Sequence, residues 1–146
     1  MDVHVRAALP KDFPALWRLY ELLGVAGDPV VSAQHAERRY AEILALPGHA
    51  IYLATSGVAV VGTYALAFLP GLTHGARDSA IVEDVVVAPE QRRHGIGKLM
   101  MQDALERCRQ RDCYKLVLSS HLQRDAAHRF YEGLGFHKHG FSFLMA

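Results

Sequence analysis

The sequence predicts a single α/β domain built around a mixed β-sheet. Strand-like and helix-like patterns alternate along its 146 residues, and apolar spacing separates the two kinds of element. Two of the expected connections between strands are hairpins and two are helical crossovers, which makes the sheet mixed. Half of the residues are hydrophobic (51%), and this length suits one domain with a full core. We therefore treat residues 1–146 as one domain.

The first elements are predicted to be a strand and two helices. Residues 3–7 fit a short strand. Asp12 can cap a helix with Pro14 in its first turn, and apolar side chains then recur at helical spacing up to Gly24. Ser32 can cap a second helix that ends near residues 47–48.

A hairpin and a long strand should follow. Residues 50–55 and 58–69 fit two strands joined by a tight turn at Ser56 and Gly57. Residues 70–78 fit a loop, and residues 79–87 form the apolar run of a central strand.

The last part of the chain alternates again between helices and strands. Residues 95–111 have the apolar stripe of a long amphipathic helix. We expect a strand over 114–119, a short helix over 125–134 that ends before Gly135, and a final strand over 136–145.

The most informative stretch is the loop between the central strand and the long helix. It contains the candidate anion-binding residues Arg92, Arg93, His94, Gly95, Ile96, Gly97 and Lys98. The first turn of a helix has backbone N–H groups without intrahelical partners, and its dipole is positive at that end. The two glycines let a bulky anion approach this backbone, and the cationic side chains add charge. The pattern predicts a pyrophosphate cradle, although the same strand–loop–helix spacing also occurs in simple turns.

Two other phosphate motifs do not fit this spacing. A dinucleotide fingerprint requires a third glycine where Met100 stands. A P-loop requires glycine at Arg92 and serine or threonine at Leu99.

A second segment, residues 124–136 (RDAAHRFYEGLGF), changes the interpretation. With the loop, it resembles the GNAT superfamily of acyl-CoA-dependent N-acyltransferases. The loop matches the family's Arg/Gln-x-x-Gly-x-Gly motif, and the second segment matches its Phe-Tyr-Glu-x-x-Gly-Phe motif. The resemblance is strong over about residues 79–137. It implies a GNAT fold with a central sheet of about six to seven strands flanked by about four helices.

The resemblance also implies acetyl-CoA as cosubstrate and assigns roles to residues. The pantetheine arm would pair with the backbone of Val85, Val86 and Val87, and the pyrophosphate would lie over residues 93–98. Tyr131 would be the general acid, with a packed aromatic as the alternative. Arg124 stands where relatives have an asparagine that contacts pantetheine, and it could contact phosphate or be a surface charge.

The proton acceptor for the amine is less defined. Glu83 and Asp84 lie on the central strand, where regular alternation would direct them to opposite faces. Many relatives carry a carboxylate at the position of Ile81, which shares a face with Glu83. We favour Glu83 as base and hold Asp84 second. A carboxylate that only pairs with an arginine or caps backbone is the alternative.

The acceptor is expected to be the primary amine of a small molecule. In this fold the acceptor pocket includes the loop before the central strand, where His74 and Arg77 could bind an anionic group. Weaker similarity to aminoalkylphosphonate and glucosamine-phosphate N-acetyltransferases points the same way. A protein or peptide acceptor, or a non-catalytic acetyl-CoA-binding module, remains an alternative.

Composition and charge exclude several other classes of function. A net charge of +1 gives no electrostatic case for bulk nucleic-acid or membrane binding, and no apolar stretch is long enough to span a bilayer. Two cysteines without metal-type spacing, and no signal-peptide pattern, lead us to expect a cytoplasmic protein. Scattered histidines give no metal motif, so we expect no metal site. The apolar end of the chain could be the edge of a homodimer interface or part of the core.

Overall fold

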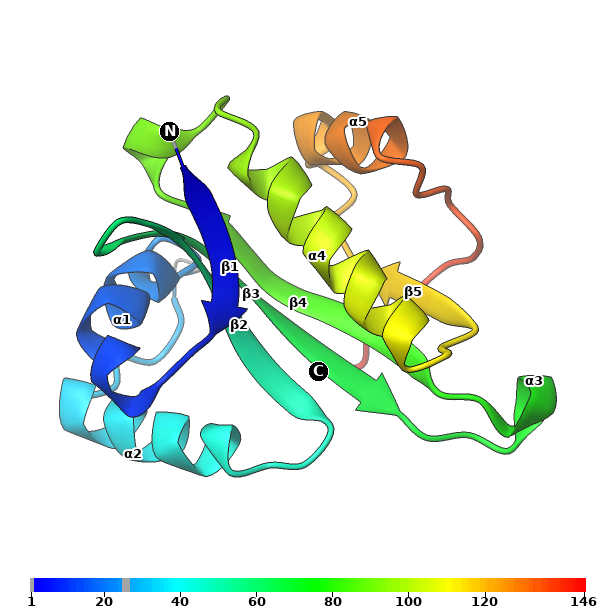
Figure 1. The fold of residues 1–146 in the computed structure, drawn as a ribbon, viewed down its shortest axis with the longest axis horizontal. Coiled ribbons are helices and arrows are strands. Elements are labelled where there is room, and N and C mark those ends of the chain that lie inside the picture. The colour runs from blue at the N-terminus through cyan, green and yellow to red at the C-terminus, as the bar shows by residue number, and fades with distance from the viewer. Residues whose placement is uncertain (1, 25–26) are drawn as a thin grey trace.

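The computed structural model describes residues 2–24 and 27–146. Five strands form one mixed sheet in the order β1-β2-β3-β4-β5, and helices cover both of its faces (Figure 1). The strands are β1 (Val3–Ala7), β2 (His49–Ser56), β3 (Ala59–Leu69), β4 (Ser79–Val87) and β5 (Lys115–Leu118). The helices are α1 (Phe13–Glu21), α2 (Ala33–Leu44), α3 (Thr73–Ala76), α4 (Ile96–Gln110) and α5 (Asp125–Gly133), with 3-10 turns η1 (Pro10–Asp12) and η2 (Pro89–Gln91).

The first four strands pair antiparallel, and β5 joins β4 in parallel. The parallel pair is joined through α4, as a helical crossover requires. Each strand predicted between residues 3 and 119 is present, and the four long helices begin and end close to the predicted positions. Ser32 caps α2 as expected, because its hydroxyl accepts a hydrogen bond of 3.1 Å from the backbone N–H of His35.

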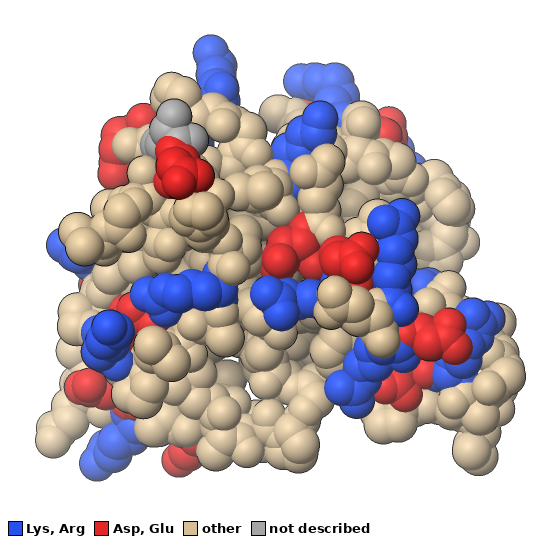
Figure 2. All heavy atoms as spheres, viewed as in Figure 1, with Lys and Arg blue, Asp and Glu red and all other residues tan. Residues whose placement is uncertain are grey.

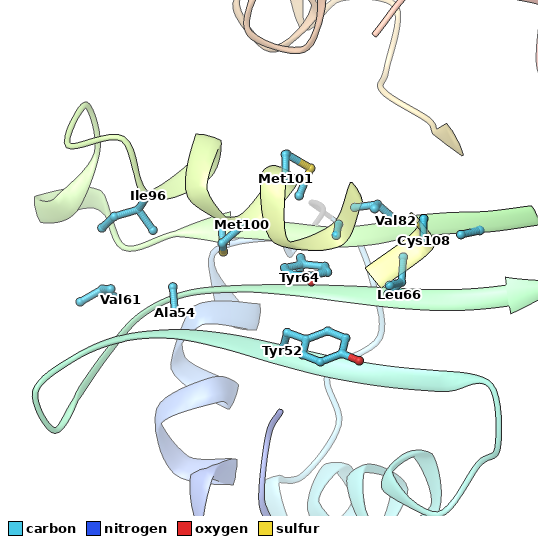
Figure 3. Close-up of a cluster of buried hydrophobic side chains, with 12 residues drawn as sticks. Tyr52, Ala54, Val61, Tyr64, Leu66, Val82, Ile96, Met100, Met101 and Cys108 are labelled. Atoms are coloured by element: carbon cyan, nitrogen blue, oxygen red, sulfur yellow. The ribbon is translucent and has the colours of Figure 1, made fainter. Parts of the chain in front are cut away.

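Alternation along the central strands divides the core into two layers. Tyr52, Tyr64 and Leu66 face α4, where they pack with Met100 and Met101 (Figure 3). The intervening residues of β2 and β3 face α1 and α2 instead. Both faces of these strands are buried, which explains why β3 reads as a nearly continuous apolar run rather than an alternating one.

Close packing between β3 and α4 depends on Gly62. A β-carbon at this position would lie 3.1 Å from the sulfur of Met100 and 3.2 Å from the backbone oxygen of Val86. The glycine therefore lets the first turns of α4 sit directly on the sheet. This contact fixes the height of the α4 N-terminus above β4.

Two predictions about the fold are wrong. Residues 136–145 form no strand, so the sheet of the described residues has five strands rather than six to seven. Instead Phe141, Phe143, Leu144 and Met145 are each 88–98% exposed. The predicted loop over 70–78 contains the short helix α3, in which His74 and Gly75 adopt left-handed backbone angles. Apolar alternation could not reveal that none of the described strands pairs with this final segment.

Candidate active site

β4 and β5 separate at the point where the candidate site begins. Their parallel pairing runs from Ser79↔Lys115 to Val82↔Leu118, whereas β4 continues to pair with β3 as far as Val87. Val85, Val86 and Val87 therefore have one edge that no described strand covers. Backbone N–H and C=O groups on such an edge can bind an extended ligand.

A β-bulge shapes β4 just before this edge. Thr63 pairs with Val86 and Ala65 pairs with Glu83, so Tyr64 alone lies opposite both Asp84 and Val85. Asp84 has the left-handed φ of 52° that such an irregularity produces. Regular alternation along β4 was the basis for predicting that Glu83 and Asp84 point to opposite faces, and the bulge interrupts that alternation. Both side chains are exposed.

The loop after β4 turns the chain into α4. Arg93 and Gly95 have φ angles of 67° and 79°, and Gly95 is the N-cap residue of α4. Among the described residues no side chain caps this helix. Its first N–H groups are therefore available to a bound anion, and the positive end of the helix dipole lies at the same place.

A cleft of about 540 Å³ joins the strand edge, the loop and α5. Its wall is made by Leu22, Leu23, Val85, Val86, Val87, Gln91, Arg92, Arg93, Gly95, Ile96, Gly97, Lys98, Arg124, Ala127, Phe130 and Tyr131. Ten of the eleven residues expected to bind the cosubstrate line it, and the exception is His94, which is exposed on the loop. A free strand edge beside a cationic helix N-terminus suits a long ligand, because the edge can hold an extended arm and the helix N-terminus can hold an anionic group.

Four cationic side chains gather at this cleft from three parts of the chain: Arg92, Arg93, Lys98 and Arg124. Within the described residues none of them forms an ion pair. On the α4 face of the molecule, by contrast, basic and acidic side chains are interspersed (Figure 2). The unpaired cluster is what an anionic ligand would neutralise.

Tyr131 enters the cleft from α5. Its ring packs against the core and lies 5.3 Å from the ring of Phe130 and 5.9 Å from that of Phe136. Burial raises the pKa of the Tyr131 hydroxyl, and the nearby positive charge of Arg124 partly offsets this rise. The hydroxyl therefore keeps its proton at neutral pH. It makes no hydrogen bond with the part of the chain that the structure describes.

His74 and Arg77 are not brought to this cleft. His74 stacks on Tyr114 with ring centroids 4.0 Å apart, and Arg77 donates a 2.9 Å hydrogen bond to the His74 carbonyl oxygen. Both lie before the start of β4, and six residues of extended strand, about 20 Å, separate Ser79 from Val85. α3 accordingly lies at the far end of the sheet (Figure 1).

Several wall residues were not predicted. Leu22 and Leu23 directly follow α1, and Gln91, Ala127 and Phe130 complete the lining. The sequence gives no signal for the leucines, because only the packing of α1 against the sheet brings them near β4. Phe130 precedes Tyr131 in the segment that resembles the family's second motif, but its place in the wall depends on its contact with Gly97 of α4.

No group of three or more His, Cys, Asp or Glu side chains within 2–24 and 27–146 could hold a metal ion. In the same residues no helix combines the length and apolarity needed to cross a bilayer.

Comparison with known proteins identifies the family. The acetyltransferase (GNAT) family profile matches residues 14–136. A glucosamine 6-phosphate N-acetyltransferase from Trypanosoma brucei brucei is 40% identical over 80 residues, a stretch that covers 55% of this chain and 52% of that protein. The matched stretch thus spans about half the length of this curated relative.

Solved structures agree with the family profile. A proposed acetyltransferase from Agrobacterium tumefaciens str. C58 superposes with a TM-score of 0.91 at 36% identity, over 98% of this chain and 99% of that one. A Trypanosoma brucei acetyltransferase superposes with a TM-score of 0.83 at 28% identity, over 99% of both chains. The chain belongs to the acetyltransferase (GNAT) family.

Proposed function

We propose that this protein transfers the acetyl group of acetyl-CoA to the primary amine of a small molecule. The observation that carries the proposal is the cleft itself, in which the free edge of Val85–Val87, the uncapped start of α4 and the hydroxyl of Tyr131 come together. The strand edge would hold the pantetheine arm, and the loop with its cationic side chains would hold the pyrophosphate. Bound acetyl-CoA supplies the acetyl group as a thioester.

Tyr131 is proposed to donate its hydroxyl proton to the sulfur of the departing thiolate, which leaves as the thiol of free coenzyme A. A free thiol has a pKa of about 8.5 and a phenol a pKa of about 10. The transfer is therefore uphill, and the raised pKa of Tyr131 makes it more so. The same rise ensures that the hydroxyl is protonated and ready at neutral pH, which a general acid requires.

The bulge of β4 offers two carboxylates as proton acceptors for the amine, whose ammonium form has a pKa of about 10. Glu83 and Asp84 are both exposed and directly precede Val85, which lines the cleft. We keep Glu83 as the favoured base and Asp84 as the second choice. A pH–rate profile of Glu83→Gln should lose the acidic limb, and retention of that limb would transfer the role to Asp84 or to water.

The acceptor we favour is an amino sugar phosphate or a comparable small amine. This choice rests on the similarity to the trypanosomal glucosamine 6-phosphate N-acetyltransferase, since His74 and Arg77, which were expected to bind an anionic acceptor, do not line the cleft. A peptide acceptor is the second candidate. A thiol-release assay with acetyl-CoA and a panel of amino sugar phosphates, aminoalkylphosphonates, polyamines, amino acids and peptides would separate these classes.

Tyr131→Phe tests the mechanism directly. We expect turnover to fall by about 10²- to 10⁴-fold, whereas acetyl-CoA affinity should change little, because the ring that packs in the wall is retained. Tyr114→Phe is the matched control, since Tyr114 stacks on His74 at the far end of the sheet. Unchanged turnover in Tyr131→Phe would remove Tyr131 as the acid. Tight acetyl-CoA binding without thiol release on any acceptor would favour a binding module.

A further inference from the structure

Arg124 occupies a position that the local structure of α5 disfavours. It is the N-cap residue of this helix. N-cap positions favour Asn, Asp, Ser and Thr, whose short side chains accept a hydrogen bond from the first free N–H groups, and the helix dipole disfavours a cation there. Among the described residues no side chain caps α5, and the guanidinium has no anionic partner. Residues that break a local rule in this way commonly serve function.

The same helix carries Tyr131. Arg124 and Tyr131 line one cleft and lie seven residues apart in the sequence. Seven residues are close to two helical turns, so the two positions share a face of α5. The side chains of a helix lean toward its N-terminus, so Tyr131 leans toward the end that carries Arg124.

Charged and titratable groups are present on every element that borders Tyr131. The loop before α4 and the first turn of that helix carry Arg92, Arg93 and Lys98, β4 carries Glu83 and Asp84, and α5 and the segment after it carry Arg124, Asp125, His128, Arg129, Glu132, His137 and Lys138. Burial raises the pKa of the Tyr131 hydroxyl, and the positive charge of Arg124 lowers it. Of the described charges, Arg124 is the one that acts on this pKa.

We propose that Arg124 supports the proton donor of the reaction, because its guanidinium stabilises the negative charge that Tyr131 acquires when its proton passes to the departing sulfur. In this step the O–H bond of Tyr131 breaks and an S–H bond forms on coenzyme A. The phenolate is stabilised by the positive charge until solvent returns a proton to it. The inference rests on the proposed role of Tyr131 as general acid. Arg124 acts through Tyr131, so it is a positioning residue.

A buried phenol needs such support. Proton transfer from a phenol to a thiolate is uphill, because the phenol has the higher pKa, and burial raises that of Tyr131 further. A nearby cation lowers this cost, and a guanidinium stays charged at any pH at which a protein is folded. Arg124 is exposed, so solvent screens its charge and its effect on the reaction is modest.

The first test measures the pKa of Tyr131 without turnover. The protein is labelled with fluorotyrosine, and the fluorine NMR signal of Tyr131 is identified among those of the six tyrosines by its loss in Tyr131→Phe. The pKa of this signal should rise in Arg124→Gln, which removes the charge and keeps the length of the side chain. It should stay at the wild-type value in Arg124→Lys. The difference between the wild type and Arg124→Gln should shrink at high salt.

Kinetics then separate this role from a contact with the cosubstrate. Arg124→Gln should lower kcat about two- to fivefold, as loss of an exposed charge does, and should change acetyl-CoA affinity less. Arg93→Gln is the comparison, because loss of a charge from the anion cradle should weaken acetyl-CoA binding instead. In a Tyr131→Phe background, Arg124→Gln should cause no further loss of kcat.

Arg129→Gln is the matched control on the same helix. Arg129 is exposed and does not line the cleft, so this substitution should leave both kcat and the pKa of Tyr131 unchanged. Arg124→Ser tests whether the arginine is kept at a cost to the fold. A serine can cap α5, so the melting temperature should rise by about 2–4 °C. A fall would show that Arg124 is kept for stability and would contradict the proposal.

Two further results would overturn the proposal. One is a pKa of Tyr131 that is the same in the wild type and in Arg124→Gln. The other is a loss of acetyl-CoA affinity in Arg124→Gln as large as that in Arg93→Gln with no loss of kcat, which would make Arg124 a phosphate contact. Full turnover in Tyr131→Phe is a different failure. It would remove Tyr131 as the acid and this inference with it, whereas an unchanged pKa in Arg124→Gln removes only the role of Arg124.

Discussion

The ring of Phe130 lies directly against Gly97, and a β-carbon at position 97 would be 3.0 Å from Cζ of Phe130. This contact joins the first turn of α4 to α5, and both residues line the cleft. The glycine of the loop therefore has two consequences. It leaves the helix N-terminus open to an anion, and it lets the helix that carries Tyr131 approach closely.

Gly97→Ala should impair binding more than stability. The added methyl group meets the far end of a ring that is 37% exposed, so the ring can move, and we expect it to move into the cleft. Acetyl-CoA affinity should fall by roughly tenfold, about 1.4 kcal/mol, while the free energy of unfolding changes by less than about 1 kcal/mol. Calorimetric titration and urea unfolding measure the two quantities.

Gly133→Ala provides the matched control within α5. No atom lies within 4 Å of a β-carbon built at Gly133, so this substitution should leave acetyl-CoA affinity unchanged. Equal losses of affinity in both variants would mean that the Phe130–Gly97 contact is not what holds the wall of the cleft.

The bulge at Asp84 should tolerate glycine better than any other residue. A non-glycine residue in the left-handed region costs about 1–2 kcal/mol, and Asp84 has a φ of 52°. Asp84→Gly should therefore leave the free energy of unfolding unchanged or raise it by up to about 1 kcal/mol, whereas Asp84→Val should lower it clearly. A strong loss of stability in the glycine variant, seen in chemical unfolding, would argue against a bulge at this position.

Asp103 should matter far more to stability than its neighbour Glu106. Its carboxylate accepts hydrogen bonds of 2.5 Å from the Tyr64 hydroxyl and 2.8 Å from Nε of Arg107. Burial, followed by this hydrogen bond, raises the pKa of Tyr64, a residue with no exposed surface. Asp103→Ala leaves the phenol without this partner and should lower the free energy of unfolding by about 1–3 kcal/mol.

Glu106→Ala removes an exposed carboxylate from the same helix and should cost less than about 0.5 kcal/mol. If Asp103→Ala lowers the free energy of unfolding less in a Tyr64→Phe background than in the wild type, the Tyr64 hydroxyl is the partner that Asp103 needs. Additive losses in that double-mutant cycle would contradict the assignment.

Asp12 should make stability depend on pH in the acidic range. It accepts hydrogen bonds of 2.7 and 2.8 Å from Arg6 and one of 2.7 Å from the Leu9 N–H. The hydrogen bond from Arg6 is the main cause that lowers the pKa of Asp12. A lowered pKa in the folded state stabilises the protein above the ordinary pKa of about 3.9. This contribution is lost as the pH falls through the lowered value.

The difference in melting temperature between the wild type and Asp12→Asn should therefore be constant near neutral pH and shrink below about pH 4. Glu37→Gln, an exposed position on α2, is the control and should show little difference at any pH. A difference between the wild type and Asp12→Asn that grows as the pH falls would contradict the sign of the effect.

Local patterns in the sequence determined much of this protein. The glycines and arginines between β4 and α4 predicted a cradle for an anion, because helix termini and glycine conformations follow from a few adjacent residues. The spacing of apolar side chains likewise predicted the five strands up to residue 118 and the four long helices. The Phe130–Tyr131 segment was identified by its resemblance to a family, not by periodicity.

Only the tertiary structure decided how these parts meet. The bulge at Asp84, the place of Leu22 and Leu23 in the cleft wall and the distance of His74 from that wall all depend on contacts between residues far apart in the chain. Residues 141–145 make the same point, since their pattern is that of a strand and no described strand pairs with them. A local pattern can determine which conformation a segment favours, but a strand needs a partner, and the partner is set by how the whole chain folds.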